Sequence, residues 1–264
     1  MKKGRRYAKE CQGVSLSAMI LIGIAFAAAC WFAVEMFAGG GEENRDRSAA
    51  SGVSLVSAAR PEAPQPSSDV QRTVSAGDEW ELLLVNYDHK LPENFMPDLM
   101  QDNGVEMDSR IVAPFEDMRA EAKKEGLSLY ASSAYRSSET QDKLFREEVS
   151  QYSKLYPTAS QAEAVAAESV ARPGYSEHGT GLAIDLNGVQ DGFVQTKEYR
   201  WLLDHAQEYG FVLRYPEDKQ EITHIKFEPW HFRYVGQENA EKMKQTDECL
   251  EEYLDSLEKT GSLH

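Results

Sequence analysis

The distribution of apolar and polar positions separates an apolar N-terminal segment from a later region that mixes helical and strand-like patterns. Residues 14–34 contain no charged side chain, five basic residues precede them, and Glu35 follows them directly. About twenty apolar residues match a bilayer core crossed by a helix, and basic residues ahead of such a helix place the N-terminus in the cytoplasm. We therefore expect an uncleaved transmembrane signal anchor over residues 14–36.

Two other interpretations of this segment stay open. Ala27-Ala28-Ala29 resembles a signal-peptide cleavage site, and a lipoprotein signal would end at Cys30. The segment is long for the apolar part of a cleaved signal, and Ala27 stands where a lipoprotein signal usually has a larger aliphatic residue. The anchor is therefore the favoured interpretation.

The composition after the anchor changes twice along the chain. Residues 37–77 are rich in Gly, Ser, Ala and Pro and offer little for a core, so we expect a flexible extracytoplasmic linker. Apolar periodicity begins at Trp80. The predicted organisation is a basic cytoplasmic arm over 1–13, the anchor over 14–36, the linker over 37–77, a folded domain over 78–240 and an acidic helical extension over 241–264.

Helical and strand-like patterns alternate irregularly in the folded region. The helical periodicity predicts helices over 114–125, from 138 onward, and over 159–171, 196–209, 238–245 and 247–258. Short apolar runs predict strands over 127–135, 182–186 and 211–215, with one or two more over 223–234, interrupted at Pro229. Because there is neither a strand–helix–strand rhythm nor an internal repeat, we expect an α+β domain.

Charge and cysteine content exclude several classes of function. The chain has 44 acidic and 28 basic residues, a net charge of −16. Nucleic-acid binding needs clustered Lys and Arg to neutralise phosphates, so no nucleic-acid partner is expected. Cys11, Cys30 and Cys249 lie too far apart in the predicted organisation to form a disulfide framework or a cysteine-based zinc site.

Two segments carry the candidate chemistry. His178 and Asp185 stand seven positions apart in one, and Glu228 and His231 stand three apart in the other. Positions seven apart on a strand face opposite ways, so we expect His178 on a glycine-rich turn before the strand that carries Asp185. Two imidazoles and one carboxylate form the ligand set of a catalytic zinc site, with one position open for water. Glu228 is then a spare carboxylate suited to accept a proton, and the pattern predicts a zinc-dependent hydrolase.

These segments resemble the VanY-type D-alanyl-D-alanine carboxypeptidases, which are zinc peptidases of the bacterial cell wall. The resemblance covers roughly residues 80–237 through these motifs, in order: Leu83-x-Val85-Asn86 with Leu91-Pro92, Ser133-Ala134-Tyr135-Arg136-Ser137 with Gln141, Ser176-x-His178-x-x-Gly181-x-Ala183-x-Asp185, Gly210-Phe211-x-x-Arg214-Tyr215-Pro216, and Glu228-Pro229-Trp230-His231-x-Arg233-Tyr234-Val235-Gly236. Two positions depart from the family pattern, because Gly179 replaces a polar residue such as Gln and His224 replaces a small residue such as Gly. His224 could therefore add a polar group near the site.

The resemblance implies a small antiparallel sheet that carries one zinc ion per chain on one face, with helices packed around it. It implies that His178, Asp185 and His231 bind the zinc and that Glu228 is the general base, which later protonates the leaving amine. Arg136 would face the scissile carbonyl and offset the charge that develops there. The residues implied to line the substrate pocket are Ser176, Ser137, Gln141 and Trp230.

Three of these residues also have simpler interpretations. Ser137 fits the N-cap of the following helix, which is its favoured role. Trp230 fits core packing as well as it fits a substrate pocket. Arg136 could pair with a surface acid, although its position in the motif favours function.

Three functions are considered. The leading expectation is a membrane-anchored zinc carboxypeptidase, outside the bacterial cell membrane, that removes the terminal D-alanine from peptidoglycan stem peptides. An L,D-carboxypeptidase acting on tetrapeptide stems would use the same catalytic residues. A non-catalytic cell-wall binding module could retain the fold and the metal but would not need Glu228 as a base. The sequence leaves the oligomeric state open.

Overall fold

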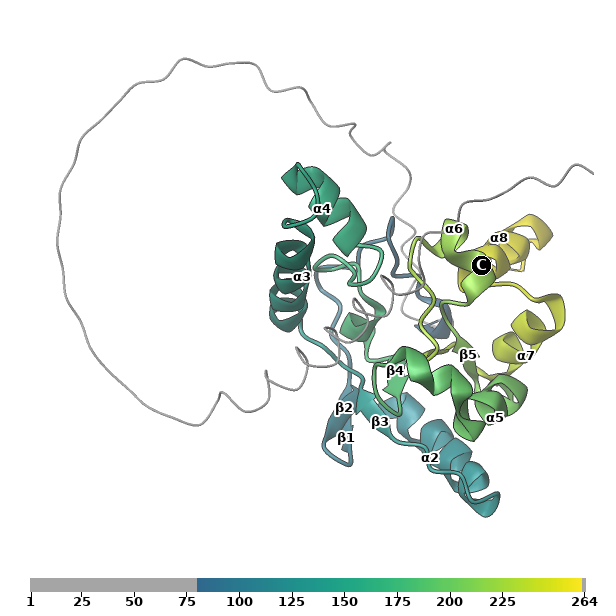
Figure 1. Ribbon diagram of the computed structural model, residues 1–264. Helices are drawn as coiled ribbons and strands as arrows, with labels where there is room; N and C mark the ends of the chain where they lie inside the picture. The colour runs from purple at the N-terminus through teal and green to yellow at the C-terminus, as the bar shows by residue number, and fades with distance from the viewer. Residues whose placement is uncertain (1–79, 263–264) are drawn as a thin grey trace, which may run out of the picture. The chain divides into compact units, whose positions relative to one another are not determined.

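Helices and short strands alternate through residues 80–262, the part of the chain that the computed structural model describes (Figure 1). The helices are α2 (Ser109–Lys124), α3 (Ser138–Tyr152), α4 (Ala159–Ala166), α5 (Lys197–His205), α6 (Gln220–Thr223), α7 (Gln237–Thr246) and α8 (Leu250–Thr260). The strands are β1 (Leu99–Asp102), β2 (Val105–Asp108), β3 (Ala131–Ser133), β4 (Ala183–Leu186), β5 (Phe211–Leu213) and β6 (His231–Tyr234). The predicted α+β class is confirmed.

The predicted arm, anchor and linker lie outside the described residues. Within residues 80–262, no helix is both long enough and apolar enough to cross a bilayer. The predicted domain boundaries stay predictions, although α7 runs through residue 240, where the extension was expected to begin.

A four-stranded antiparallel sheet with the order β3-β4-β6-β5 forms the centre of the described region. In the β4–β6 pair, Ile184 lies opposite Phe232 and Asp185 lies opposite His231. Neighbouring residues on a strand point to opposite faces. The sheet therefore has an apolar face that carries Ile184 and Phe232, and a polar face that carries Asp185 and His231.

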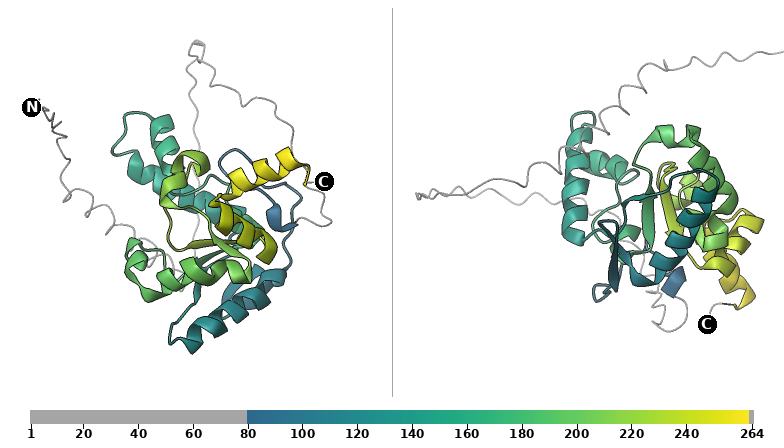
Figure 2. Two further views of the ribbon diagram at one scale, coloured as in Figure 1. Left: turned by 90° about the vertical axis from the view of Figure 1, so that its right-hand side faces the viewer. Right: turned by 90° about the horizontal axis from the view of Figure 1, so that it is seen from below.

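Helices α2 and α5 pack on the apolar face of the sheet. The shared core includes Phe115 and Met118 of α2 and Trp201 of α5, together with Ile184 and Phe232 of the sheet. Seen from below, the strands lie between α3 and α4 on one side and α2, α5 and α7 on the other (Figure 2). Helices α3 and α4 and the loops therefore lie on the side of the polar face.

Helix α2 begins earlier than the sequence predicts. Its N-cap is Asp108, whose carboxylate accepts a hydrogen bond of 3.0 Å from the backbone N–H of Arg110. Pro114 favoured a start at that residue because proline donates no backbone hydrogen bond. In the structure Pro114 lies inside the helix, where the buried Ile111 and Val112 tie the preceding turn to the core.

A second apolar cluster holds the C-terminal helices. It joins Leu82 and Val235 to Met243 of α7 and to Leu250 and Leu254 of α8, among others. The two predicted C-terminal helices are confirmed, and both are part of the packed structure.

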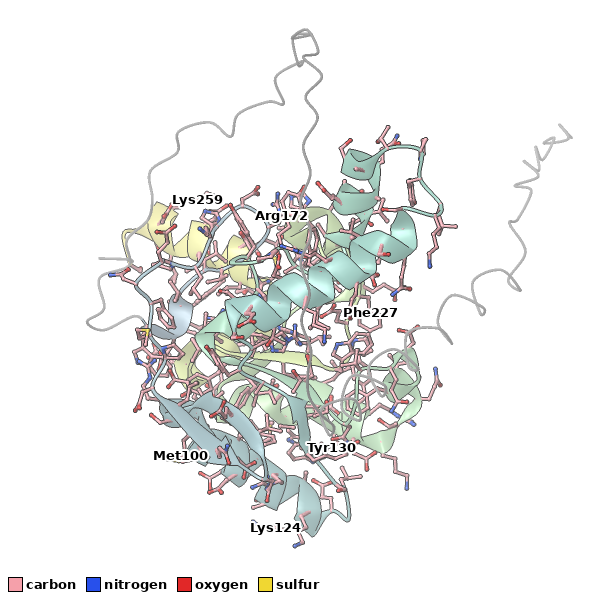
Figure 3. All side chains as sticks on the ribbon, turned by 90° about the vertical axis from the view of Figure 1, so that its left-hand side faces the viewer. Met100, Lys124, Tyr130, Arg172, Phe227 and Lys259 are labelled. Atoms are coloured by element: carbon pink, nitrogen blue, oxygen red, sulfur yellow. The ribbon has the colours of Figure 1, made fainter. Side chains whose placement is uncertain are left out.

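Figure 3 shows that Lys259, near the end of α8, and Lys124, at the end of α2, lie at opposite ends of the described region.

Two predicted strand regions differ from the structure. The strand expected over 127–135 is reduced to Ala131–Ser133, where its pairing with β4 contains a register shift. The region 223–234 contributes only β6, because α6 ends at Thr223 and His224 adopts a left-handed conformation with φ 58°. The β1–β2 hairpin was not predicted from the sequence. It turns at Asn103 and Gly104 with φ 48° and 89°, and a two-residue hairpin turn of this type requires positive φ at both positions.

Candidate active site

Three side chains with metal-binding atoms meet on the polar face of the sheet. His178 lies in the short 3-10 turn Glu177–Thr180 before β4, Asp185 lies on β4, and His231 begins β6. Their candidate ligand atoms all lie within 4.8 Å of one another, and all three residues are buried. The strand register aligns Asp185 with His231, and the turn brings His178 beside them, as the spacing predicted.

The turn that carries His178 is fixed by local contacts. The hydroxyl of Ser176 accepts a hydrogen bond of 3.4 Å from the backbone N–H of His178. Gly181 ends the turn with φ 74°, and a Cβ at this position would lie 2.8 Å from the backbone nitrogen of Asp108. Only glycine meets both requirements without strain.

A hydrogen bond of His178 and the atom distances around His231 identify the nitrogen that each histidine turns to the centre. His178 Nδ1 lies 2.6 Å from the backbone carbonyl of Ala134. A carbonyl only accepts, so Nδ1 carries the proton and the free Nε2 faces Asp185 Oδ2 at 3.4 Å. His231 instead presents Nδ1, which lies 3.2 Å from Asp185 Oδ1. The two imidazole rings meet edge to face with their centroids 4.9 Å apart.

The electrostatics of this centre fit a cation. Burial alone would lower the pKa of His231, but the facing carboxylates of Asp185 and Glu177 raise it to about 9. Burial alone would raise the pKa of Asp185, but His178 and His231 hold it below its ordinary value. Asp185 Oδ1 is buried and has no hydrogen-bond partner among the described residues. A zinc ion accepts two imidazole nitrogens and one carboxylate oxygen and keeps an open position, so the donor set fits zinc.

A carboxylate and a guanidinium flank the metal-binding group. Glu228 Oε2 lies 3.6 Å from His231 Nδ1, and Arg136 Nη2 lies 3.8 Å from Asp185 Oδ2. Burial raises the pKa of the Glu228 carboxyl to about 8, and a bound dication would lower it. Gln141 Oε1 accepts a hydrogen bond of 2.9 Å from Arg136 Nη1, which orients the guanidinium. The structure thus brings together a ligand set, a spare carboxylate and a fixed positive charge.

The four residues predicted to line the substrate pocket differ in their surroundings. Gln141 is buried and bonds Arg136, and Ser176 caps the turn of His178. Ser137 is the N-cap of α3, where its hydroxyl accepts a hydrogen bond of 3.2 Å from a backbone N–H three residues on. Trp230 packs in the main core. Contact of these four residues with substrate stays a prediction.

Glu177, which precedes His178, was not predicted from the sequence as a site residue. Its side chain is fully buried, and Oε1 accepts hydrogen bonds of 2.7 Å from Arg214 and 2.8 Å from Arg233. Its other oxygen lies 3.5 Å from His231 Nε2. The available signal was a charged residue inside the metal motif, but its partners lie 37 and 56 residues away in the chain.

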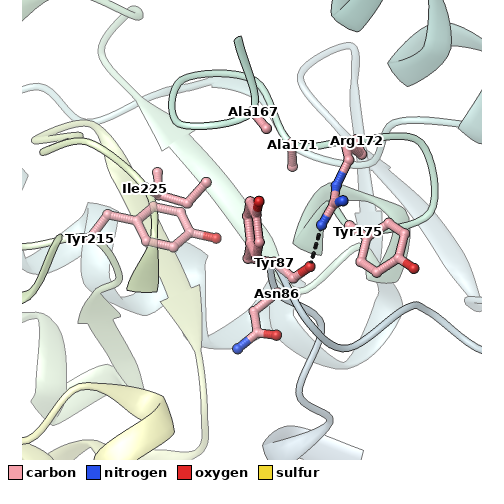
Figure 4. Close-up of a pocket in the computed structure, with 8 residues that line it drawn as sticks. All are labelled: Asn86, Tyr87, Ala167, Ala171, Arg172, Tyr175, Tyr215 and Ile225. Carbon is pink, nitrogen blue, oxygen red and sulfur yellow. Dashed lines mark hydrogen bonds between the residues drawn. The ribbon is translucent and has the colours of Figure 1, made fainter. Parts of the chain in front are cut away.

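Tyr215 connects the metal-binding group to a small cavity. Its ring lies 4.9 Å from that of His231, centroid to centroid. The cavity, of about 10 Å³, is lined by Asn86, Tyr87, Ala167, Ala171, Arg172, Tyr175, Tyr215 and Ile225 (Figure 4). Figure 4 shows Tyr87 between Tyr215 and Arg172, whose guanidinium donates a hydrogen bond of 2.6 Å to the Tyr87 carbonyl.

The two departures from the family pattern have structural consequences. At Gly179 a Cβ would lie 3.0 Å from Leu91 Cδ2, so the longer polar residue expected here would displace that side chain. His224 packs on Tyr87, with ring centroids 5.0 Å apart. Both rings line a larger hollow of about 280 Å³ next to Lys226. His224 therefore adds a polar group to this hollow.

Sequence comparisons identify relatives of the chain. Residues 104–237 match the VanY family model, described as D-alanyl-D-alanine carboxypeptidase. A D-alanyl-D-alanine carboxypeptidase of Enterococcus faecalis is 42% identical over 181 residues, which are 67% of this chain and 67% of that protein. The putative carboxypeptidase YodJ of Bacillus subtilis is 37% identical over 195 residues, covering 67% of this chain and 68% of the relative.

Solved structures agree with the sequence comparisons. VanYB in complex with D-alanine-D-alanine is 42% identical with a TM-score of 0.62, covering 67% of this chain and 98% of that one. A VanY mutant from a VanB-type resistance cassette, in complex with Zn(II), has 42% identity, a TM-score of 0.61 and coverages of 67% and 99%. The LD-carboxypeptidase LdcB has 36% identity, a TM-score of 0.59 and coverages of 66% and 86%. The protein thus belongs to the VanY family of D-alanyl-D-alanine carboxypeptidases, whose motifs its sequence carries.

Proposed function

We propose that this protein is a zinc-dependent carboxypeptidase that removes the terminal D-alanine from peptidoglycan stem peptides. The observation that carries the proposal is the meeting of His178, Asp185 and His231 within 4.8 Å, with the Glu228 carboxylate 3.6 Å from His231. A module that only bound the cell wall would have no use for this carboxylate as a base. The similar structures in complex with Zn(II) and with D-alanine-D-alanine support the metal and the substrate class.

The side chains around the ligand set divide the chemical work. Bound zinc would supply Lewis acidity at the scissile carbonyl and lower the pKa of the attacking water. Glu228 accepts a proton from that water and delivers it to the leaving amine, so its carboxylate is unchanged at the end of the reaction. Arg136, oriented by Gln141, offsets the negative charge that forms on the carbonyl oxygen.

The peptide length that the enzyme accepts separates two related activities. A D,D-carboxypeptidase removes the fifth residue of a pentapeptide stem, and an L,D-carboxypeptidase removes the fourth residue of a tetrapeptide. The same catalytic residues serve both reactions. The proposal favours D,D-cleavage, because the D-alanyl-D-alanine carboxypeptidase of E. faecalis is 42% identical and the LD-carboxypeptidase LdcB is 36% identical.

The activity is tested on the full-length chain in detergent micelles. We expect release of D-alanine from a muramyl pentapeptide in the presence of zinc, loss of this release with a chelator, and its return when zinc is restored. Mass spectrometry of the products identifies the bond that was cut. Cleavage of the tetrapeptide alone would move the assignment to L,D-cleavage, and no cleavage of either peptide by the zinc-loaded protein would overturn the enzymatic proposal.

The proposed location is the bacterial cell membrane, with residues 14–36 as anchor and the catalytic domain outside. The support is the uncharged apolar segment with basic residues before it, which lies outside the described residues. We expect added protease to digest the domain on intact spheroplasts while an epitope fused ahead of residue 1 stays protected. Protection of both the domain and the epitope, or release of the domain into the medium, would contradict this location.

A further inference from the structure

A buried carboxylate lies behind the metal-binding group, on the side of His231 away from Asp185. Both side-chain oxygens of Glu177 are inside the protein. Oε1 is shared by Arg214 and Arg233, at 2.7 and 2.8 Å. Oε2 lies 3.5 Å from His231 Nε2, and neither of these two atoms has a hydrogen-bond partner among the described residues. The two unpaired atoms therefore lie close together.

Arg214 and Arg233 set the position of Glu177, and each of them is fixed by further hydrogen bonds. Arg233 donates to the backbone carbonyls of Glu81 and Leu83, at 3.0 and 2.8 Å. Arg214 is bound through both of its terminal nitrogens by Glu251, at 2.8 and 2.6 Å. Because each guanidinium is planar and bound on several sides, the carboxylate between them has little freedom to turn away from His231.

His231 needs a partner on this side if it is to bind a metal through Nδ1. Nδ1 is the nitrogen that faces Asp185 and Glu228, at 3.2 and 3.6 Å. A metal-binding imidazole ordinarily donates its other N–H to a carboxylate or carbonyl, which fixes the ring and the tautomer. His178 follows this rule through the Ala134 carbonyl. Glu177 is the group in the matching place for His231.

The C-terminal helix α8 contacts this ion-pair network through Glu251. This residue lies in the first turn of α8, beyond residues 104–237 that match the family model. Its carboxylate binds Arg214 and also accepts a hydrogen bond of 2.9 Å from Asn86. The neighbouring Leu250 and Leu254 are buried in the second apolar cluster, which fixes the position of α8. Contacts therefore run from Glu251 on α8 through Arg214 to Glu177, which lies beside the proposed ligand His231.

We propose that Glu177 is a positioning residue for His231 and that Glu251, through Arg214, holds Glu177 in place. The C-terminal helix thereby contributes to metal affinity without touching the metal. This inference rests on the proposed zinc site. It differs from a purely structural role of the same ion pairs, which would change stability but not the intrinsic affinity of the folded protein for zinc.

The test measures zinc affinity separately from folding. Zinc would be titrated into the metal-free full-length protein in detergent against a chromophoric chelator, and circular dichroism would give the folded fraction. Glu177→Gln should weaken zinc binding by about 10–100-fold, the range for partners of metal ligands. Glu251→Gln should weaken it in the same direction by a smaller factor, and it decides the question if Glu177→Gln does not fold.

The matched control is Asp102→Asn. Asp102 is also a buried carboxylate bound through both oxygens by an arginine, Arg119, at 2.7 and 3.1 Å, but it lies on the β1–β2 hairpin. This variant should lose stability while its zinc affinity stays at the wild-type value.

Equal zinc affinity in wild type, Glu177→Gln and Glu251→Gln would overturn the inference while leaving the proposed function intact. An equal fall in zinc affinity in Asp102→Asn, Glu177→Gln and Glu251→Gln would also overturn the inference. The fall would then follow from lost stability alone. Failure of the wild-type protein to bind zinc would instead remove the proposed metal site itself.

Discussion

Asp185 on β4 and His231 on β6 lie directly opposite each other in an antiparallel pair, with Asp185 Oδ1 3.2 Å from His231 Nδ1. The alignment of two of the three proposed ligands therefore depends on strand register. A slip of one residue would turn one of them toward the core, where Ile184 and Phe232 now lie. The core on one face of the sheet thus holds the metal-binding group on the other.

Removal of one ligand should abolish metal binding. In His231→Ala the set keeps only His178 and Asp185, so we expect zinc affinity to fall by more than about 100-fold, beyond the effect of losing a partner of a ligand. Zinc content after dialysis and D-alanine release would both be measured, with His205→Ala as a control on a half-buried histidine that pairs with Glu208. A His231→Ala protein that keeps its zinc would remove His231 from the ligand set.

Arg136 should affect turnover more than metal content. Arg136→Met removes the positive charge that we propose faces the scissile carbonyl, and loss of one such group costs about 100–1000-fold in kcat. Arg136→Lys should recover only part of this loss, because lysine lacks the planar group that bonds Gln141 and Ser133. Steady-state kinetics with parallel zinc analysis would check both variants. Loss of zinc from Arg136→Met, or unchanged kcat, would contradict the assigned role.

The turn before β4 should tolerate no side chain at Gly181. Gly181→Ala places a Cβ 2.8 Å from the backbone nitrogen of Asp108, at a φ of 74°. The conformation alone costs about 1–3 kcal/mol in the free energy of unfolding, and the contact adds to this. Gly192→Ala is the control, because nothing lies within 4 Å of its added Cβ. Urea unfolding curves that coincide for these two variants would show that the turn is not constrained as described.

Much of the site could be predicted from sequence because its signals are local. The spacing of His178 and Asp185 required a turn followed by a strand, and both are present. The Glu177 network could not be predicted, because it depends on which buried arginines the sheet brings beside this residue. Likewise, the apolar pattern of 223–234 predicted one or two strands. His224 adopts a left-handed conformation and Pro229 lies in a turn, so only β6 pairs in the sheet.

The buried thiol of Cys249 should make stability fall at alkaline pH. Burial raises its pKa to about 12, whereas a thiol in an unfolded chain ionises near about 8.5. Between these values the unfolded chain binds fewer protons than the folded one. The free energy of unfolding therefore decreases as pH rises above about 8.5, by at most about 1.4 kcal/mol per pH unit from this group.

Urea unfolding of wild type and Cys249→Ala, from about pH 7 to about pH 10, brackets the ionisation of the unfolded thiol and isolates this contribution. The variant should show the shallower decline at the alkaline end, whatever its stability at neutral pH. If the free energies of unfolding of wild type and Cys249→Ala declined in parallel with pH throughout, the fold would not protect the thiol from ionisation.

The most direct test of the proposed zinc-dependent hydrolysis is to measure zinc content and D-alanine release together in Glu228→Gln. The variant keeps His178, Asp185 and His231 but cannot accept a proton from the attacking water. We expect one zinc per chain, as in wild type, with turnover of the pentapeptide reduced by at least about 100-fold, the lower range for a lost general base. Turnover at the wild-type rate in the zinc-loaded variant would contradict the role of Glu228 and with it the proposed mechanism.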